Sequence, residues 1–341
     1  MVSFESDYIC GAHPKILEAF AKTNMDAQPG YGFDRYTASA AGKIAAACEL
    51  PEAQVTFLSG GTMTNLIAVD ALLKSYEGVI AAETGHVNVH ESGAIEHTGH
   101  KVLTLPSYNG KMRADDLRAM LVKYYEDETA EHMVRPGMVY VTWPTEQGTL
   151  YSKAELTAIA DVCHEYRLPL YLDGARLGYG LASTAADLTL PEIARITDVF
   201  YIGGTKVGAL CGEALVFTKQ NQPDHFLSFI KQRGALFAKG RLCSVQFDAL
   251  FTDGLYEEIS RHAIRQAERV KQIIRDKGYS FHPETFTNQI FPVLPMEMIA
   301  PLREKIRFEL WEKLDEAHMV VRFVTSWSTT DADLDELERV L

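Results

Sequence analysis

The residues Leu168-Pro169-Leu170-Tyr171-Leu172-Asp173-Gly174-Ala175-Arg176 carry an acid at the end of a short apolar run. A second apolar run, Val199-Phe200-Tyr201-Ile202, leads into Gly203-Gly204-Thr205-Lys206-Val207-Gly208. Apolar runs of this length, bounded by glycine and charge, are typical of buried β-strands. Because ligands of open α/β sheets bind outside the carboxyl ends of the strands, we expect Asp173 and Lys206 to meet at one ligand-binding rim.

An acid and an amine at the same rim form the pair that pyridoxal phosphate (PLP) requires. The amine of a lysine bonds covalently to the aldehyde of this cofactor, and an acid keeps its pyridine nitrogen protonated. The sequence therefore predicts PLP as the cofactor, with Lys206 and Asp173 as catalytic and cofactor-binding residues.

A third segment has the composition of a phosphate-binding turn. The probable strand Val55–Leu58 runs into Ser59-Gly60-Gly61-Thr62-Met63-Thr64-Asn65, and a helical stretch follows from Leu66 to Leu73. Glycines let the backbone approach an anion, hydroxyls add donors, and a helix N-terminus presents free N–H groups. Most glycine-rich turns are plain turns, so the prediction that Gly60-Gly61-Thr62 hold the phosphate depends on the neighbouring acid and lysine.

Strand-like runs and amphipathic helical segments alternate along most of the chain. This alternation is typical of an α/β fold with a mostly parallel, doubly wound sheet, here of seven strands. The last strand is expected to be antiparallel, because too few residues follow Lys206 for a crossover. The strand candidates are Val55–Leu58, Val79–Ala82, Lys101–Leu105, Met138–Thr142, Leu168–Leu172, Asp198–Ile202 and Ala214–Thr218.

The C-terminal part has a shorter α+β pattern. We expect a helical region from about Asp253 to Lys277, then a strand in Asn288–Leu294, a helix near Pro301–Leu314, a strand in Val320–Val324 and a final helix from Asp331. The predicted organisation is an N-terminal arm (1–28), a large PLP-binding domain (29–250) and a smaller C-terminal α+β domain (251–341).

The composition indicates a cytoplasmic enzyme. The net charge of −13 argues against binding to nucleic acid or to an anionic membrane. Five scattered cysteines without a CxxC pattern fit reduced thiols rather than a disulfide framework. The first residues lack the features of a signal peptide, and no apolar run approaches the roughly 20 residues of a membrane helix.

Four histidines, His86, His90, His97 and His100, suggest an alternative function. The spacing of His86 and His90 could place two metal ligands on one helix face, as in a zinc hydrolase. The HExxH zinc pattern is absent, however, so we expect no metal site. His86 differs from the others because it follows the predicted strand Val79–Ala82, again at the rim of the sheet.

Arg322 interrupts the apolar strand Met319-Val320-Val321-Arg322-Phe323-Val324. A charged side chain in such a strand is costly unless it meets an anion. The carboxylate of an amino acid, which accepts two parallel hydrogen bonds from a guanidinium group, would supply that anion.

The order and spacing of these motifs resemble the low-specificity threonine aldolase family of fold type I PLP enzymes, within the aromatic amino acid β-eliminating lyase/threonine aldolase group. The resemblance is carried by Ser6-Asp7, Tyr31-Gly32, Ser59–Asn65, His86, Asp173-Gly174-Ala175-Arg176, Thr205-Lys206 and Val321–Thr325.

This resemblance implies roles for further residues. It implies that His86 stacks on the cofactor ring and acts in catalysis, and that Thr205 and Arg176 also contact the cofactor. Arg322 would bind the substrate carboxylate with help from Arg176, Ser6 and Tyr31. Arg241 is a weaker candidate for the cofactor phosphate, from its own or a neighbouring subunit, with an ordinary helix-start arginine as the alternative. The assembly implied is a homodimer or homotetramer with active sites near the subunit interface.

The function implied is cleavage of β-hydroxy-α-amino acids, such as L-threonine and L-allo-threonine, to glycine and an aldehyde. A β-eliminating lyase or an aminotransferase would use the same Asp, Lys and Arg and remains the alternative. Many family members carry a second active-site histidine in a segment that is here Thr142-Trp143-Pro144-Thr145-Glu146. The absence of that histidine leaves the base at the β-hydroxyl, and the preferred substrate, open.

Overall fold

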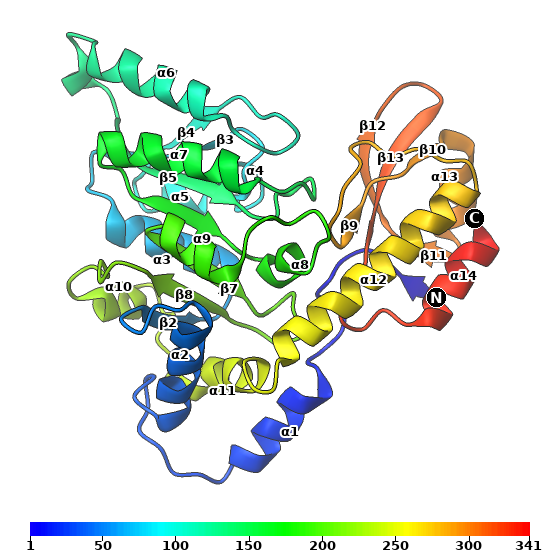
Figure 1. Cartoon of the computed structure of the whole chain (residues 1–341), viewed down its shortest axis with the longest axis horizontal. Helices are drawn as coiled ribbons and strands as arrows, with labels where there is room; N and C mark the ends of the chain where they lie inside the picture. Colours follow the sequence, from blue (N-terminus) through cyan, green and yellow to red (C-terminus); the bar gives the residue numbers. More distant parts are fainter.

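A seven-stranded sheet forms the centre of the computed structural model, which describes residues 1–341 (Figure 1). Its strand order is β2-β8-β7-β6-β5-β3-β4, and only β8 runs antiparallel to its neighbours. The strands are β2 (Gln54–Leu58), β3 (Glu77–Ala82), β4 (Val102–Leu105), β5 (Arg135–Thr142), β6 (Leu170–Asp173), β7 (Val199–Gly203) and β8 (Glu213–Phe217). The predicted α/β class, the seven strands and the antiparallel last strand are therefore confirmed.

Helices cover both faces of this sheet. Successive strand residues point to opposite faces, so each strand contributes to two separate apolar cores. One core includes α3 (Gly61–Leu72), α4 (His86–Val89), α5 (Ala94–His97) and α10 (Phe226–Gln232). The other includes α2 (Arg35–Ala47), α6 (Ala114–Tyr125), α7 (Lys153–Tyr166), α8 (Leu177–Leu181), α9 (Leu190–Ile196) and α11 (Arg241–Leu250), while a short 3-10 helix (Ala130–His132) precedes β5.

The long helix α12 (Leu255–Asp276) runs from the large lobe to a smaller C-terminal lobe (Figure 1). The smaller lobe has its own apolar core and an antiparallel sheet in which β13 pairs with β9, β10 and β12. Its elements are β9 (Gln289–Ile290), β10 (Val293–Pro295), α13 (Met296–Arg303), β11 (Ile306–Arg307), β12 (Glu309–Lys313), β13 (His318–Val324) and α14 (Asp331–Val340).

One predicted element of this lobe is wrong. The helix expected near Pro301–Leu314 ends at Arg303, and the chain continues as β11 and β12. Strand β12 is extended because its backbone pairs with β13, with Glu309 opposite Arg322. This pairing between strands overrides the helix propensity of a segment rich in Glu, Leu and Lys.

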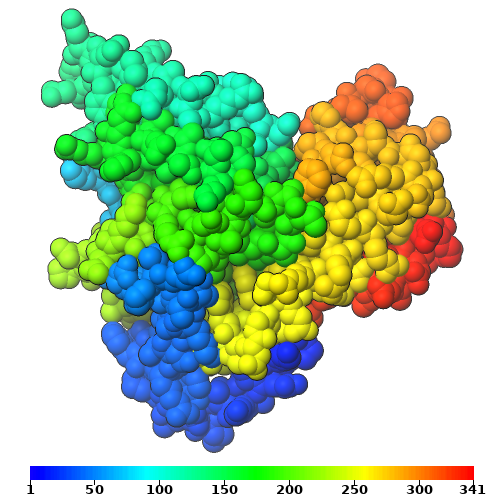
Figure 2. All heavy atoms as spheres, viewed as in Figure 1, coloured from blue at the N-terminus to red at the C-terminus, as the bar shows by residue number.

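The N-terminal residues contact both lobes. Strand β1 (Val2–Ser3) pairs with β11 of the small lobe, whereas α1 (Pro14–Thr23) packs against α11 of the large lobe. Figure 2 shows the residues after about 250 gathered largely on one side, with a notch between them and the larger lobe. The three-part division at residues 28 and 250 stays a prediction. No helix is both long and apolar enough to cross a membrane.

Candidate active site

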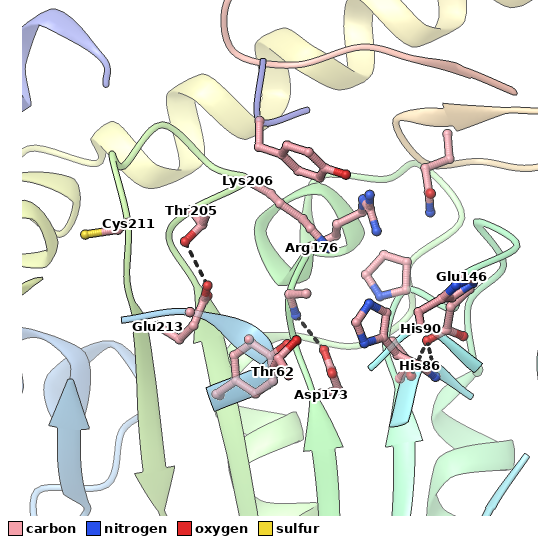
Figure 3. Close-up of a pocket in the computed structure, with 18 of the residues that line it drawn as sticks. Thr62, His86, His90, Glu146, Asp173, Arg176, Thr205, Lys206, Cys211 and Glu213 are labelled. Carbon is pink, nitrogen blue, oxygen red and sulfur yellow. Dashed lines mark hydrogen bonds between the residues drawn. The ribbon is translucent and has the colours of Figure 1, made fainter. Parts of the chain in front are cut away.

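A cavity of about 540 Å³ lies where the carboxyl ends of the central strands face the small lobe. Its lining brings together residues from both lobes, far apart in the sequence (Figure 3). The residues singled out in the sequence that line it are Gly60, Gly61, Thr62, His86, Asp173, Arg176, Thr205, Lys206 and Arg322. The expected meeting of Asp173 and Lys206 at one rim is therefore observed.

Asp173 ends β6 and is buried, at 1% exposure. Its Oδ2 accepts hydrogen bonds from the Tyr140 hydroxyl at 2.6 Å and from Asn65 Nδ2 at 3.0 Å, and its Oδ1 accepts from the Ala175 N–H at 2.9 Å. Burial alone would raise the pKa of Asp173, but His86 and these donors outweigh it, so the pKa lies below its ordinary value. The carboxylate is thus held ionised at the edge of the cavity.

Lys206 follows β7 in a loop that turns back into β8. Its backbone carbonyl accepts a hydrogen bond from the Tyr179 hydroxyl at 2.5 Å, which fixes the loop. Burial, and then the nearby Arg176 cation, lower the pKa of the Lys206 amine, although Asp7 and Asp173 act in the opposite direction. A lower pKa increases the fraction of neutral amine, which is the nucleophilic form.

The turn after β2 has the geometry of an anion site. Helix α3 begins at Gly61, five residues earlier than expected, and no side chain caps its N-terminus. Its first N–H groups are thus left for a ligand, and Ser59, Gly60 and Thr62 line the cavity beside them. A Cβ atom at Gly61 would lie 3.1 Å from the Tyr201 hydroxyl, so the backbone is closely packed here.

His86 begins α4, and its ring lines the cavity. Its Nδ1 lies 2.8 Å from Glu91 Oε1, which orients the ring. His90 also lines the cavity, and the centre of its ring lies 5.6 Å from the centre of the His86 ring. No group of three or more His, Cys, Asp or Glu side chains is placed to hold a metal ion.

Arg176 is paired with Asp7, a residue of the N-terminal segment. Its Nε and Nη2 donate to the two Asp7 oxygens at 2.6 and 3.1 Å, and Asn288 also donates to Asp7 at 2.9 Å. Ser6 lies next to this pair but does not line the cavity, and its buried hydroxyl has no hydrogen-bond partner. Arg176 therefore lines the cavity, and the Asp7 carboxylate already balances part of its positive charge.

Arg322 comes from β13 of the small lobe and is 9% exposed. It forms an ion pair with Glu309, and its Nη1 donates to Gln289 Oε1 at 3.2 Å. Its guanidinium lies 5.2 Å from the ring centre of Trp311, and its buried Nε has no partner. Burial, together with Arg176, lowers the pKa of Arg322. Arg322 thus retains donor capacity for an anion inside the cavity.

Two further predicted site residues, Tyr31 and Arg241, lie outside this cavity. Tyr31 lines a separate, mainly apolar cavity of about 150 Å³, and its ring lies under Lys231. Arg241 begins α11 and donates to the backbone carbonyls of residues 23, 24 and 26. Within one chain neither residue contributes to the site, so their predicted roles, including that of Arg241 toward a neighbouring subunit, stay predictions.

Three glutamates that were not predicted as site residues also line the cavity: Glu146, Glu213 and Glu309, the last of which pairs with Arg322. Glu213 accepts hydrogen bonds from the Thr205 hydroxyl at 2.8 Å and the Gly204 N–H at 3.1 Å, and burial raises its pKa to about 8. Glu146 lies in the turn after β5. The signal for Glu213 was its place at the rim, one residue before the predicted strand Ala214–Thr218. Glu146 ends the segment in which a histidine was expected.

Comparisons with known proteins agree with this geometry. The family model described as beta-eliminating lyase matches residues 3–287. A low specificity L-threonine aldolase from a Pseudomonas species is 33% identical, with 98% of this chain and 95% of the relative covered, and one from Pseudomonas aeruginosa is 31% identical, with 98% and 96% covered. A solved threonine aldolase from Leishmania major superposes with a TM-score of 0.96 and 43% identity, covering 100% of this chain and 98% of that structure.

Proposed function

The chain belongs to the beta-eliminating lyase family, and we propose that within it this protein is an aldolase that cleaves β-hydroxy-α-amino acids to glycine and an aldehyde. L-Threonine, which the names of the two Pseudomonas relatives give, and L-allo-threonine are the substrates we propose. The main support for the proposal is the cavity that Asp173, Lys206 and Arg322 share, which brings together an ionised acid, an amine and a guanidinium cation.

We propose PLP as the cofactor, because the residues present fit it. The uncapped N-terminus of α3, with Gly60 and Thr62, would hold the phosphate. Asp173 would pair with the pyridine nitrogen, and Lys206 would bond to the aldehyde. When bound, the cofactor supplies an electron-accepting ring that stabilises negative charge on the substrate α-carbon.

The protein's own side chains would orient the substrate. Arg322 and Arg176, which line the cavity, would bind the α-carboxylate, and His86 would cover the cofactor ring and exclude water. Ser6, which does not line the cavity, would help only by a shift toward it. Fixing the carboxylate would set the orientation of the bonds at the α-carbon, and would thereby favour cleavage of the Cα–Cβ bond over loss of the α-proton or of CO2.

A product assay tests this proposal against the alternative. The purified protein, loaded with PLP, is incubated with L-threonine, and the products are separated. An aldolase gives glycine and acetaldehyde in equal amounts. A β-eliminating lyase or an aminotransferase gives ammonia or a keto acid instead, and either result would replace the proposed reaction.

We also propose that the enzyme is a cytoplasmic homodimer or homotetramer. Exposed apolar side chains, among them Tyr31 at 44% and Phe33 at 69%, lie in the loop that precedes α2. A second copy of the chain covering this loop would bury them and would bring Tyr31 and Arg241 near a neighbouring site. Size-exclusion chromatography with light scattering measures the assembly.

A further inference from the structure

Glu146 has no role among the residues proposed above to bind the cofactor or the substrate. It follows β5 in the turn that contains Trp143 and Pro144, is 7% exposed, and lines the cavity near His86 and His90 (Figure 3). The burial of a carboxyl group in a ligand cavity is costly unless both of its oxygens have partners.

The two oxygens of Glu146 differ in this respect. Oε1 accepts hydrogen bonds from the Thr142 hydroxyl at 2.8 Å and from the His86 backbone N–H at 3.0 Å. Oε2 is buried and has no hydrogen-bond partner in the chain. The carboxyl group is therefore anchored through one oxygen, while the other, on a side chain that lines the cavity, has no partner within the chain.

The surroundings make this carboxyl group a stronger base than an exposed glutamate. Burial raises the pKa of Glu146 and Asp173 adds to this effect, while the hydrogen bonds and His86 oppose it, and the pKa remains above its ordinary value. A base with a pKa closer to neutrality is better matched to removing a hydroxyl proton. The charged or titratable groups around it are His86 on α4, Asp173 on β6, Arg176 before α8, and Tyr140 and Tyr151 on either side of the turn.

His86 is less suited to this task. Its Nδ1 is held by Glu91, and if the ring covers the cofactor as proposed, its face would be occupied by that contact. The segment from Thr142 to Glu146 contains no histidine, so Glu146 is the residue of that turn able to exchange a proton.

We propose that Glu146 is the acid–base residue at the β-oxygen of the substrate, acting through Oε2. This inference rests on the proposed aldolase function. In cleavage, the β-hydroxyl proton moves to Oε2, the Cα–Cβ bond breaks, and a C=O bond forms in the departing aldehyde. The electron pair of the broken bond stays on Cα, where a proton later adds to give glycine. In the reverse direction, protonated Glu146 returns the proton to the aldehyde oxygen.

The test compares two reactions of the PLP-loaded enzyme, of which only one involves a β-oxygen. Cleavage of L-threonine requires the proton transfer, whereas exchange of the glycine α-proton with deuterated water does not. For Glu146→Gln we expect kcat for threonine cleavage to fall by at least about 100-fold, the range of a lost general base. Glycine exchange, followed by NMR, should stay within about threefold of the wild-type rate.

Glu146→Asp is the matched variant, because it keeps a carboxyl group on a shorter side chain. Its cleavage rate should exceed that of Glu146→Gln by at least about tenfold. In the protein without cofactor, infrared spectra should show two carboxyl groups, those of Glu146 and Glu213, that titrate above the ordinary glutamate range, and only the Glu146 signal should be missing in Glu146→Gln.

Three results would overturn the inference: wild-type cleavage by Glu146→Gln, equal cleavage rates for the two variants, or parallel loss of glycine exchange and cleavage. The first two would show that the carboxyl group is not the base, and the third that Glu146 has a structural role. Failure of the proposed function itself looks different, because the wild-type enzyme would then not cleave threonine at all.

Discussion

The proposed chemistry requires an ionised Asp173 and a neutral Lys206 in one cavity, and the surroundings of the two residues favour these states. Donors from Tyr140, Asn65 and Ala175 hold Asp173 ionised, while burial and Arg176 favour neutral Lys206. Replacement of Asp173 by Asn keeps the shape but removes the charge that, in our proposal, would face the pyridine nitrogen of PLP.

We predict that Asp173→Asn lowers kcat for threonine cleavage by at least about 100-fold while PLP still binds, because the electron-accepting character of the ring is lost. Steady-state kinetics and the PLP content of the purified protein check this. Asp161→Asn, at an exposed position in α7, is the control and should behave as wild type. A normal kcat in Asp173→Asn would mean that the acid has only a structural role.

Arg322 is the residue that we propose binds the substrate carboxylate. In the structure its guanidinium group already pairs with Glu309, which would compete with that carboxylate. Arg322→Lys keeps the charge but loses the planar two-donor geometry that matches a carboxylate. We expect kcat/KM for L-threonine to fall by at least about tenfold, which corresponds to about 1.4 kcal/mol, and glycine to bind more weakly. PLP affinity should not change.

Titrations with PLP and with glycine distinguish whether Arg322 binds the cofactor phosphate or the substrate carboxylate. Arg307→Lys, exposed in β11, is the matched control and should have no effect. Loss of PLP in Arg322→Lys would assign the residue to the phosphate, and unchanged amino-acid binding would leave the carboxylate to Arg176.

Among the elements, α3 has the most direct predicted link to the cofactor. Its uncapped N-terminus opens into the cavity, and a side chain at Gly61 would press on the Tyr201 hydroxyl. We predict that Gly61→Ala raises the Kd for PLP about tenfold, or about 1.4 kcal/mol, because the backbone is displaced from the phosphate. Equilibrium titration of the cofactor-free protein measures this.

Gly42→Ala in α2 is a suitable comparison, since a Cβ atom there meets nothing within 4 Å. It should leave the Kd unchanged and should stabilise the helix by about 0.5–1 kcal/mol. Equal PLP affinity in Gly61→Ala and Gly42→Ala would show that the N-terminus of α3 does not bind the phosphate.

The elements also show what the sequence could and could not predict. Runs such as Val199–Ile202 are apolar on both sides because helices cover both faces, so each central strand was recognisable by itself. Strand β12 was not recognisable, because its backbone is extended only through pairing with β13. Glu146 and Glu213 were missed for a related reason. A glutamate in a turn, such as Glu146, or at the first position of a strand, such as Glu213, looks solvated until the fold buries it.

At the scale of the whole molecule, a buried ion pair joins the two lobes. Asp7 follows β1 of the small lobe and pairs with Arg176 of the large lobe, with Asn288 as a further donor. Burial would raise the pKa of Asp7, but Arg176, Lys206 and Asn288 together lower it. The carboxylate therefore stabilises the fold at pH values above its unfolded pKa of about 3.9, and this contribution is lost as the pH falls through the lower folded value.

We predict that Asp7→Asn lowers the free energy of unfolding at pH 7 by about 3 kcal/mol, because Arg176 is left buried and unpaired. The difference from wild type should shrink in acid as Asp7 becomes protonated. Urea unfolding over a pH series measures both effects. Ser6→Ala is the matched control, because the Ser6 hydroxyl has no partner and its loss should cost little. A pH-independent difference would contradict the assignment of the stabilisation to this carboxylate.

The central claim is that Lys206 is the amine that bonds to PLP. The most direct measurement is borohydride reduction of the PLP-loaded protein, followed by proteolysis and mass mapping of the modified peptide. We predict a single reduced PLP adduct on the peptide that contains Lys206, and no adduct in Lys206→Ala, which should also lose the absorbance at about 420 nm. An adduct on another lysine, or a yellow and reducible Lys206→Ala protein, would contradict it.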